Sequence, residues 1–261
     1  MIHDHPNFPS AHLPSTRTIS VYLPHEYDQD PTRRFPVLYM QDGQNLFDPA
    51  KAFAGNPWHC DATVEQVTQL GLAEPILIVG VANTPKRIQE YGYYEVAETV
   101  PPSLAREYGR FLVEEVKPFI DATYRTRSHS VDTGIGGSSM GGLIALQLAK
   151  WYPDVFGKCA AMSPSLWWDG ESFLRHLSSE SDWLRTVRLW LDMGGREGWT
   201  KPDQLANLQR CRRATTIFKA HRASYQYLEA THAEHNEAAW GERFAEVLAY
   251  LYPASTEFGD P

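Results

Sequence analysis

The stretch Gly134-Ile135-Gly136-Gly137-Ser138-Ser139-Met140-Gly141-Gly142 decides the fold of this chain. Residues 137–141 read Gly-Ser-Ser-Met-Gly, which matches the pattern G-x-S-x-G. The apolar-tending residues 131–135 precede the pattern and the apolar residues 143–151 follow it. A strand that enters a helix through a glycine-lined turn is the context in which this pattern indicates a nucleophile elbow. Glycines are needed because Cβ atoms in so tight a turn would clash with the neighbouring strand and helix. We therefore expect Ser139 Oγ to project over the carboxyl edge of a sheet.

Glycine-rich turns between a strand and a helix also bind phosphate, so this alternative has to be weighed. A dinucleotide fingerprint that starts at Gly134 would need glycine or alanine where Ser139 stands. A phosphate loop would need lysine after its second glycine, but Gly142 and Leu143 follow Gly141. The flanking sequence therefore favours the nucleophile elbow.

The composition restricts the classes of partner. The 261 residues include 32 acidic side chains against 24 lysines and arginines, a net charge of −8, with no basic cluster. This charge argues against nucleic acid as a partner. Three cysteines without a C-x-x-C pair fit neither a disulfide framework nor a zinc ribbon. The N-terminus resembles no signal peptide and no apolar run approaches 18 residues, so we expect a cytoplasmic protein without membrane association, metal or cofactor. The oligomeric state stays open.

Short apolar runs alternate with helical patterns along the chain. This alternation predicts a mostly parallel central sheet with right-handed crossovers and helices on both faces. No repeat or linker divides the chain, so we predict one α/β domain over residues 1–261, with residues 1–15 a loosely ordered segment. Strands are predicted at residues 18–23, 35–40, 75–81, 131–135, 158–162, 187–193 and 224–229, and helices at residues 61–70 (with Asp61 as N-cap), 103–122, 143–151, 203–213 and from His235 to the chain end, with long loops at residues 44–58 and 83–102.

A serine hydroxyl needs a base, and that base needs a carboxylate to orient it. In chains with the elbow motif the acid and then the histidine follow the serine. The histidine candidates are His232 and His235, and we favour His235 because it begins the final helix, from where its side chain can swing back toward Ser139. The two histidines could also form a metal pair, but the sequence places no third ligand. The acid candidates are Asp192, inside a predicted strand, and Glu197, just beyond its end; we favour Glu197 because it can project over the sheet edge.

Acyl transfer also needs donors for the oxyanion. One expected donor is the backbone N–H of Met140, the residue after the serine, and the second comes from the loop after an early central strand. In the loop Asp42-Gly43-Gln44 we choose Gln44 N–H. Each such donor is worth roughly 3 kcal/mol in the transition state.

Several segments together resemble one known family. From residue 18 to residue 250 the chain is similar to the putative esterase (esterase D-like) family of α/β-hydrolases, relatives of the enterochelin, feruloyl and acetyl-xylan esterases. The segments that carry the resemblance are Val21-Tyr22-Leu23-Pro24, Val37-Leu38-Tyr39-Met40-Gln41-Asp42-Gly43-Gln44-Asn45-Leu46-Phe47-Asp48, Gly137-Ser138-Ser139-Met140-Gly141-Gly142, Ser163-Pro164-Ser165-Leu166-Trp167-Trp168 and His235-Asn236-Glu237-Ala238-Ala239-Trp240.

This resemblance implies a single-domain α/β-hydrolase fold and a serine carboxylesterase that works through an acyl-enzyme. It implies Ser139 as nucleophile, His235 as base and Glu197 as acid, with Gln44 and Met140 N–H at the oxyanion. The expected partner is a small-molecule ester whose acyl and alcohol groups stay open. The elbow Gly-Ser-Ser-Met-Gly differs from the Gly-His-Ser-Met-Gly of S-formylglutathione hydrolases, which argues against that substrate.

Aromatic residues in the loops are candidates for a substrate pocket. They are Trp58, Trp167, Trp168, Trp199 and the tyrosines of residues 91–94, with Arg87, Arg196 and Lys86 as the loop cations near the site. The alternative is that the tryptophans pack under the long loops. Two other functions compete with ester hydrolysis: acyl transfer to a sugar or alcohol acceptor, and a non-catalytic binding module that retains the fold.

Overall fold

A single eight-stranded mixed sheet forms the centre of the computed structural model, which describes residues 1–92 and 102–254. Neighbouring strands from β4 to β8 are parallel, whereas β2 pairs antiparallel with β4 and β1 antiparallel with β2. The prediction of a mostly parallel sheet is confirmed. In sheet order the strands are β1 (Ile2–Phe8), β2 (Arg17–Tyr22), β4 (Leu77–Val81), β3 (Val37–Gln41), β5 (Thr133–Ser138), β6 (Lys158–Met162), β7 (Arg188–Gly194) and β8 (Ser224–Ala230).

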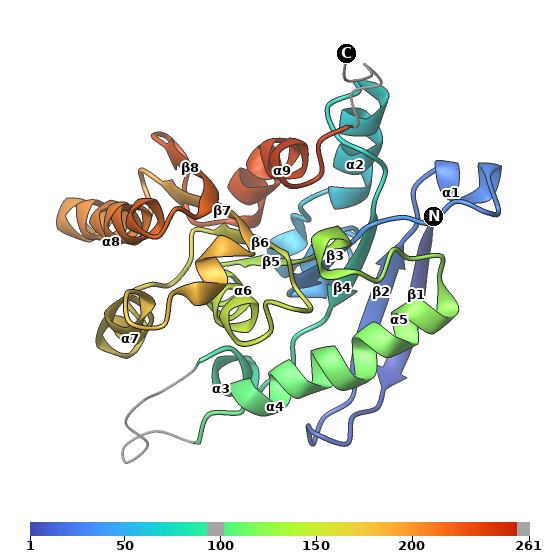
Figure 1. The fold of residues 1–261 in the computed structure, drawn as a ribbon, viewed down its shortest axis with the longest axis horizontal. Coiled ribbons are helices and arrows are strands. Elements are labelled where there is room, and N and C mark those ends of the chain that lie inside the picture. The colour runs from blue at the N-terminus through green and yellow to red at the C-terminus, as the bar shows by residue number, and fades with distance from the viewer. Residues whose placement is uncertain (93–101, 255–261) are drawn as a thin grey trace.

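Helices cover both faces of this sheet. In Figure 1, α2 and α9 lie on one side of the strands, and α4, α5, α6 and α7 lie on the other. A π-helical turn, Phe111–Val116, joins α4 to α5. Of the described helices, none has the length and apolar character to cross a bilayer. The helices are α1 (Glu26–Gln29), α2 (Cys60–Gln69), α3 (Arg87–Tyr91), α4 (Ala105–Arg110), α5 (Lys117–Thr123), α6 (Met140–Trp151), α7 (Trp168–Leu177), α8 (Lys201–Ala220) and α9 (Glu237–Leu251).

Two hydrophobic cores follow from the alternation of side chains along the buried strands. On β3, the side chain of Tyr39 belongs to the core on the face covered by helices α4 to α8. The side chain of the next residue, Met40, belongs to the core on the other face, under α2 and α9. On β7, Leu191 and Trp190 divide in the same way. Because successive strand residues point to opposite faces, a strand covered on both faces is expected to be apolar at most positions. This explains why β4 has no polar side chain and why apolar residues fill most positions of β3 and β6.

Several expectations from the sequence are wrong in detail, among them the long loop expected at residues 83–102, which contains helix α3. Residues 2–8, expected to be loosely ordered, form edge strand β1, which is held by backbone pairing with β2 and has mostly exposed side chains that show no apolar alternation. Helix α2 begins one residue before Asp61, after His59 in the left-handed region. Helix α7 occupies a segment for which no helix was expected. His235 precedes the final helix, whose N-cap is Asn236.

Candidate functional site

Ser139 occupies the sharp turn between β5 and α6. Its φ of 57° and ψ of −124° are a strained combination for a residue with a side chain. Ser139 N–H donates to the Met162 carbonyl at 3.0 Å, and its own carbonyl accepts from Ser165 N–H at 3.1 Å. A Cβ on Gly137 would lie 2.9 Å from the carbonyl carbon of Gly141, so only glycine fits there. Backbone hydrogen bonds on both sides of the turn therefore hold Ser139 at the end of β5.

His235 connects Ser139 to Glu197. Its Nε2 lies 2.9 Å from Ser139 Oγ and its Nδ1 lies 2.7 Å from Glu197 Oε2. The three side chains come from the carboxyl ends of β5, β7 and β8. The imidazole is 44% exposed, whereas the glutamate side chain is only 2% exposed. A base open to a substrate and held by a buried carboxylate is the geometry that activates a serine hydroxyl.

The first turn of α9 orients this histidine. Asn236 caps the helix by accepting from Ala239 N–H at 3.0 Å, which directs the preceding residue over the sheet edge. The indole of Trp240 packs edge-on against the imidazole, with ring centroids 4.9 Å apart. His232, the other histidine candidate, is exposed. Within residues 1–92 and 102–254, no three His, Cys, Asp or Glu side chains gather as a metal ion would require.

Two buried carboxylates lie at the end of β7, and they have different partners. Glu197 Oε1 accepts from Gly194 N–H at 2.9 Å and from Ser163 Oγ at 2.5 Å, which leaves Oε2 for His235. Asp192 instead accepts from the Ser163 N–H and the Trp190 indole, and forms an ion pair with Arg243. Burial raises the pKa of Asp192, and the Arg243 charge opposes that shift. Asp192 thus anchors the loop after β6, while Glu197 contacts the histidine.

Sequence reasoning missed the side chains around Glu197. Ser163 and Trp240 lie within the segments that carry the family resemblance, so a signal was present for them. Arg243 lies one helical turn further along α9 and had no such signal. Ser165, in the same loop as Ser163, places its Oγ 3.3 Å from Ser139 Oγ.

The loop that carries Gln44 is tightly held against the sheet. Asp42 has a φ of 56°, and a 3₁₀ turn, Gly43–Asn45, follows it. A Cβ on Gly43 would lie 2.3 Å from the Gly80 carbonyl carbon, so the loop can approach β4 only through glycine. The N–H groups of Gln44 and Met140 lie in the first turns of helical segments, where no intrahelical acceptor exists. Their role at an oxyanion stays a prediction.

Arg87 supports this loop through an ion pair with Asp42, and its expected contact with a substrate stays a prediction. Its Nε and Nη2 donate to the two carboxylate oxygens of Asp42 at 2.7 and 2.8 Å, and its guanidinium lies over the Tyr91 ring. Burial lowers the pKa of Arg87, but the bonds to Asp42 outweigh this and raise it overall. The pair uses two of the five N–H donors of the guanidinium and ties α3 to the loop after β3.

The tryptophans divide between core and cleft. Trp58 is 4% exposed and packs on Trp240 and Phe244, so the expectation that it lines a pocket is wrong. Trp167 is 49% exposed, and Trp168 lies half-buried behind it with the rings 5.6 Å apart. Tyr91 is fully buried, and the tyrosines at positions 93 and 94 lie outside the described residues.

A cleft of about 670 Å³ opens beside His235. Trp167 and the fully exposed Trp199 are the large aromatic side chains on its wall, and Arg196, Asn207 and Arg210 add hydrogen-bond donors. Asp203 and Glu234 also line it, so its charge is mixed. Such a lining suits a ligand with a flat ring and several polar groups.

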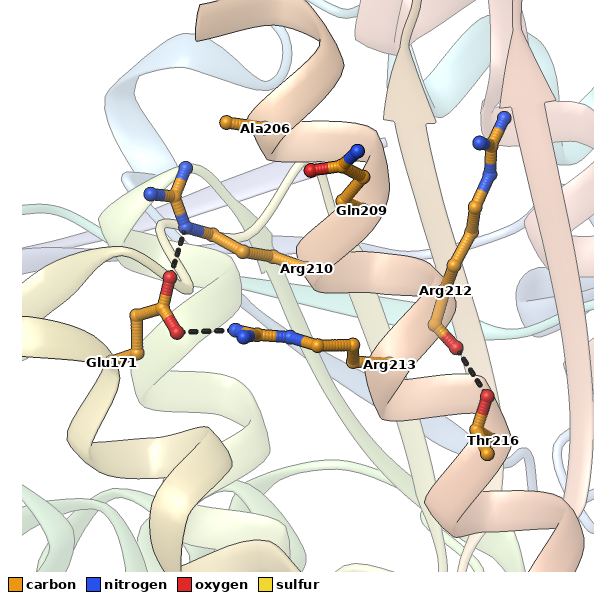
Figure 2. A pocket seen from close by; sticks show the side chains of 7 residues that line it. All are labelled: Glu171, Ala206, Gln209, Arg210, Arg212, Arg213 and Thr216. Carbon is orange, nitrogen blue, oxygen red and sulfur yellow. Dashed lines mark hydrogen bonds and ion pairs between the residues drawn. The ribbon is translucent and has the colours of Figure 1, made fainter.

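A second hollow of about 550 Å³ lies on the outer side of α8 (Figure 2). Here Glu171 of α7 accepts from Arg210 Nε at 2.8 Å with one oxygen and from Arg213 with the other. The bond from Arg213 is the main cause of the lowered pKa of Glu171, with Arg210 adding to it against partial desolvation. These ion pairs join α7 to α8, so we assign the hollow a structural role.

Comparison with known proteins places this geometry in a family. The family model described as "Putative esterase" matches residues 10–251. The chain belongs to this family. Among curated proteins, the uncharacterized protein YbbA of Bacillus subtilis is 26% identical over 74% of this chain and 73% of its own length. The iron(III) salmochelin esterase of Escherichia coli is 27% identical over 72% of this chain but only 44% of its own length.

Solved structures of esterases share the fold. A ferulic acid esterase superposes with a TM-score of 0.74 at 19% identity, covering 97% of this chain and 98% of its own. An IroE-like serine hydrolase from Shewanella oneidensis gives a TM-score of 0.76 at 20% identity, covering 96% and 79%. The expected α/β-hydrolase fold and family are therefore confirmed. As a member of the esterase family, the chain is a hydrolase that acts on ester bonds.

Proposed function

We propose that this esterase hydrolyses a carboxylic ester through an acyl-enzyme, with Ser139 as nucleophile, His235 as general base and acid, and Glu197 as the orienting carboxylate. The observation that carries the proposal is the continuous hydrogen-bond chain from Ser139 Oγ through His235 to Glu197, with distances of 2.9 and 2.7 Å. These distances lie within the range in which a base can accept the proton of a nucleophile.

The proposed reaction has two balanced halves. As Ser139 Oγ forms a bond to the ester carbonyl carbon, its proton passes to His235 Nε2. The tetrahedral intermediate collapses, the imidazolium donates that proton to the departing alkoxide, and the acyl group remains on Ser139. Water then attacks the acyl-enzyme and gives a proton to His235; as the bond from Ser139 Oγ to the acyl carbon breaks, the imidazolium returns that proton to Oγ and the acid product leaves. Glu197 stays ionised throughout and stabilises the imidazolium.

The backbone N–H groups of Gln44 and Met140 are our proposed oxyanion donors. Support comes from their positions in first helical turns and from the rigid attachment of the Gln44 loop through Asp42 and Arg87. A preorganised donor pair costs no rearrangement when the negative charge develops, and each donor is worth roughly 3 kcal/mol.

The substrate we propose is a small ester with an aryl or sugar group in the cleft beside His235. Support comes from the exposed Trp167 and Trp199 on the cleft wall and from the polar groups between them. Relatives named as feruloyl and siderophore esterases lend further support.

Steady-state hydrolysis of p-nitrophenyl esters by the wild type and by Ser139→Ala tests the proposal. We expect the variant to fold normally and to lose activity by about 10⁴-fold or more. A fluorophosphonate should label Ser139 in the wild type. Full activity in Ser139→Ala, or a wild type that neither hydrolyses esters nor reacts with the fluorophosphonate, would refute it. If added alcohols capture most of the acyl group, acyl transfer replaces hydrolysis as the reaction.

A further inference from the structure

A buried polar cluster lies behind the proposed triad, on the side away from the substrate. It contains Ser163, Asp192, Glu197, Trp240 and Arg243, each at most 5% exposed. The catalytic steps above use only Glu197. A buried polar network of this kind is costly unless each member has a partner, so its other members call for an explanation.

The hydrogen-bond directions in this cluster are set by chemistry. The indole N–H of Trp240 and Nη2 of Arg243 both lie 3.0 Å from Ser163 Oγ. Indole and guanidinium groups can only donate, so the Ser163 hydroxyl accepts from both and uses both of its lone pairs. Its own proton must then go to a carboxylate. Glu197 Oε1 lies 2.5 Å away and Asp192 Oδ1 lies 3.5 Å away, so Glu197 receives it.

The hydrogen bonds that Glu197 accepts also orient the histidine. Glu197 Oε1 accepts from both Ser163 O–H and Gly194 N–H, so this oxygen cannot carry a proton of its own. When Glu197 is ionised, Oε2 also accepts, so His235 Nδ1 carries the proton of the neutral imidazole. The neutral ring keeps Nε2 free to accept the Ser139 proton.

The backbone and the charges favour a dedicated role for Ser163. Its φ of 44° is uncommon for a residue with a side chain, and such strain persists only where the surroundings enforce it. Arg243, 2.9 Å from Asp192 and 3.7 Å from Glu197, supplies a buried positive charge between the two carboxylates. Since a guanidinium does not lose its proton, the direction of the whole chain of bonds is permanent.

We propose that Ser163 is a positioning residue of the triad: its hydroxyl, oriented by Trp240 and Arg243, donates to Glu197 and thereby holds His235 in the tautomer that can accept a proton from Ser139. This inference rests on the proposed function. It predicts that loss of the Ser163 hydroxyl slows the chemical step without affecting substrate binding.

Ser163→Ala and Ser163→Gly together test the inference. Both variants lack the hydroxyl, but glycine adopts a positive φ without strain, whereas alanine does not. A loss of activity that both variants share is therefore due to the missing hydroxyl, and the glycine variant is the one expected to keep the fold. A hydrogen bond to a charged group has a strength that corresponds to roughly 10- to 100-fold in rate. We therefore expect kcat for p-nitrophenyl esters to fall roughly 10- to 100-fold in both variants with KM unchanged. Fluorophosphonate labelling of Ser139 should slow by a similar factor.

A matched control is Thr126→Val. Thr126 lies beside Phe35, before the amino end of β3, whereas the proposed triad lies at the carboxyl ends of the strands. The buried Thr126 hydroxyl also donates to a carboxylate, Asp121 at 2.7 Å, which is paired with Lys117. We expect kcat to stay within about twofold of the wild type, because this carboxylate touches no proposed catalytic residue.

The outcomes separate the inference from the function on which it rests. If Ser163→Gly keeps wild-type kcat, or if KM rises while kcat stays constant, Ser163 does not position the triad, although Ser139→Ala would still be inactive. If the wild type neither hydrolyses esters nor reacts with the fluorophosphonate, the proposed function fails and the inference falls with it.

Discussion

Replacement of Glu197 by glutamine is the sharpest test of how this site is arranged, because the two side chains have nearly the same shape. Glu197 Oε1 receives hydrogen bonds from Gly194 N–H and Ser163 O–H. In Glu197→Gln the amide oxygen must take this position, because an NH₂ group there would face two donors. The amide NH₂ group then faces His235 Nδ1.

An amide donor at that position reverses the tautomer of the His235 imidazole. Nδ1 becomes the acceptor, so the single proton of the neutral ring moves to Nε2, which lies 2.9 Å from Ser139 Oγ. A protonated Nε2 cannot accept the serine proton. Comparable carboxylate-to-amide changes that impose the wrong tautomer cost about 10⁴-fold in kcat. We expect a loss of about 10³- to 10⁴-fold, which is about 4–5.5 kcal/mol of transition-state stabilisation.

The measurement is kcat on a p-nitrophenyl ester, with circular dichroism to check folding, and Asp192→Asn is the control. Asp192 contacts Ser163, Trp190 and Arg243 but not His235, so its change should lower stability by about 3 kcal/mol or more while kcat stays within about tenfold. If Asp192→Asn loses as much activity as we expect of Glu197→Gln, or if Glu197→Gln retains kcat within tenfold, the assignment of the acid is wrong.

Two further predictions concern the cleft and the helix pair. Trp199→Ala should raise KM for aryl esters about three- to tenfold and leave kcat and Tm unchanged, because the ring is fully exposed and supports no other residue; a KM that does not change would remove Trp199 from the substrate site. Glu171→Gln should lower the free energy of unfolding by about 1 kcal/mol at pH 7, as expected for a partly exposed pair. Because the pKa of Glu171 is lowered in the folded state, its stabilisation is present above its ordinary value of 4.5 and is lost as the pH falls below it. Chemical denaturation at pH 7 and pH 3 should therefore show a difference from wild type that narrows at the lower pH, and a difference that stays constant would show that the ion pair does not contribute.

Local patterns in the sequence were enough to place most of the central strands. Strand β6 coincides with its predicted range, residues 158–162, because its apolar run, residues 159–162, lies between the polar residues Lys158 and Ser163. Strand β1 gave no such signal, since its backbone is paired while most of its side chains face solvent. The outermost strand of a sheet is therefore the element that the pattern of apolar residues predicts least well.

The choice between Glu197 and Asp192 illustrates a second limit. Both carboxylates are buried, so burial does not separate them, and only the position of Glu197 beyond the end of β7 favoured it over Asp192 inside the strand. Several of their hydrogen-bond partners come from the loop after β6, from the loop after β8 and from α9, which are distant in the sequence. The same is true of Arg87: its partner Asp42 lies 45 positions away, so no local pattern indicated that Arg87 supports the loop after β3.

The sequence by itself determined the glycine-lined elbow at Ser139 and the family, because both depend on motifs made of residues that are neighbours along the chain; the order of serine, acid and histidine along the chain supports the proposed triad. Only the tertiary structure decided which carboxylate His235 contacts, that Trp58 packs in the core, and that Ser163, Trp240 and Arg243 stand behind Glu197. The physical reason is that a glycine-lined turn is a local constraint on the backbone, whereas a hydrogen-bond direction depends on every donor and acceptor that folding brings around one buried oxygen.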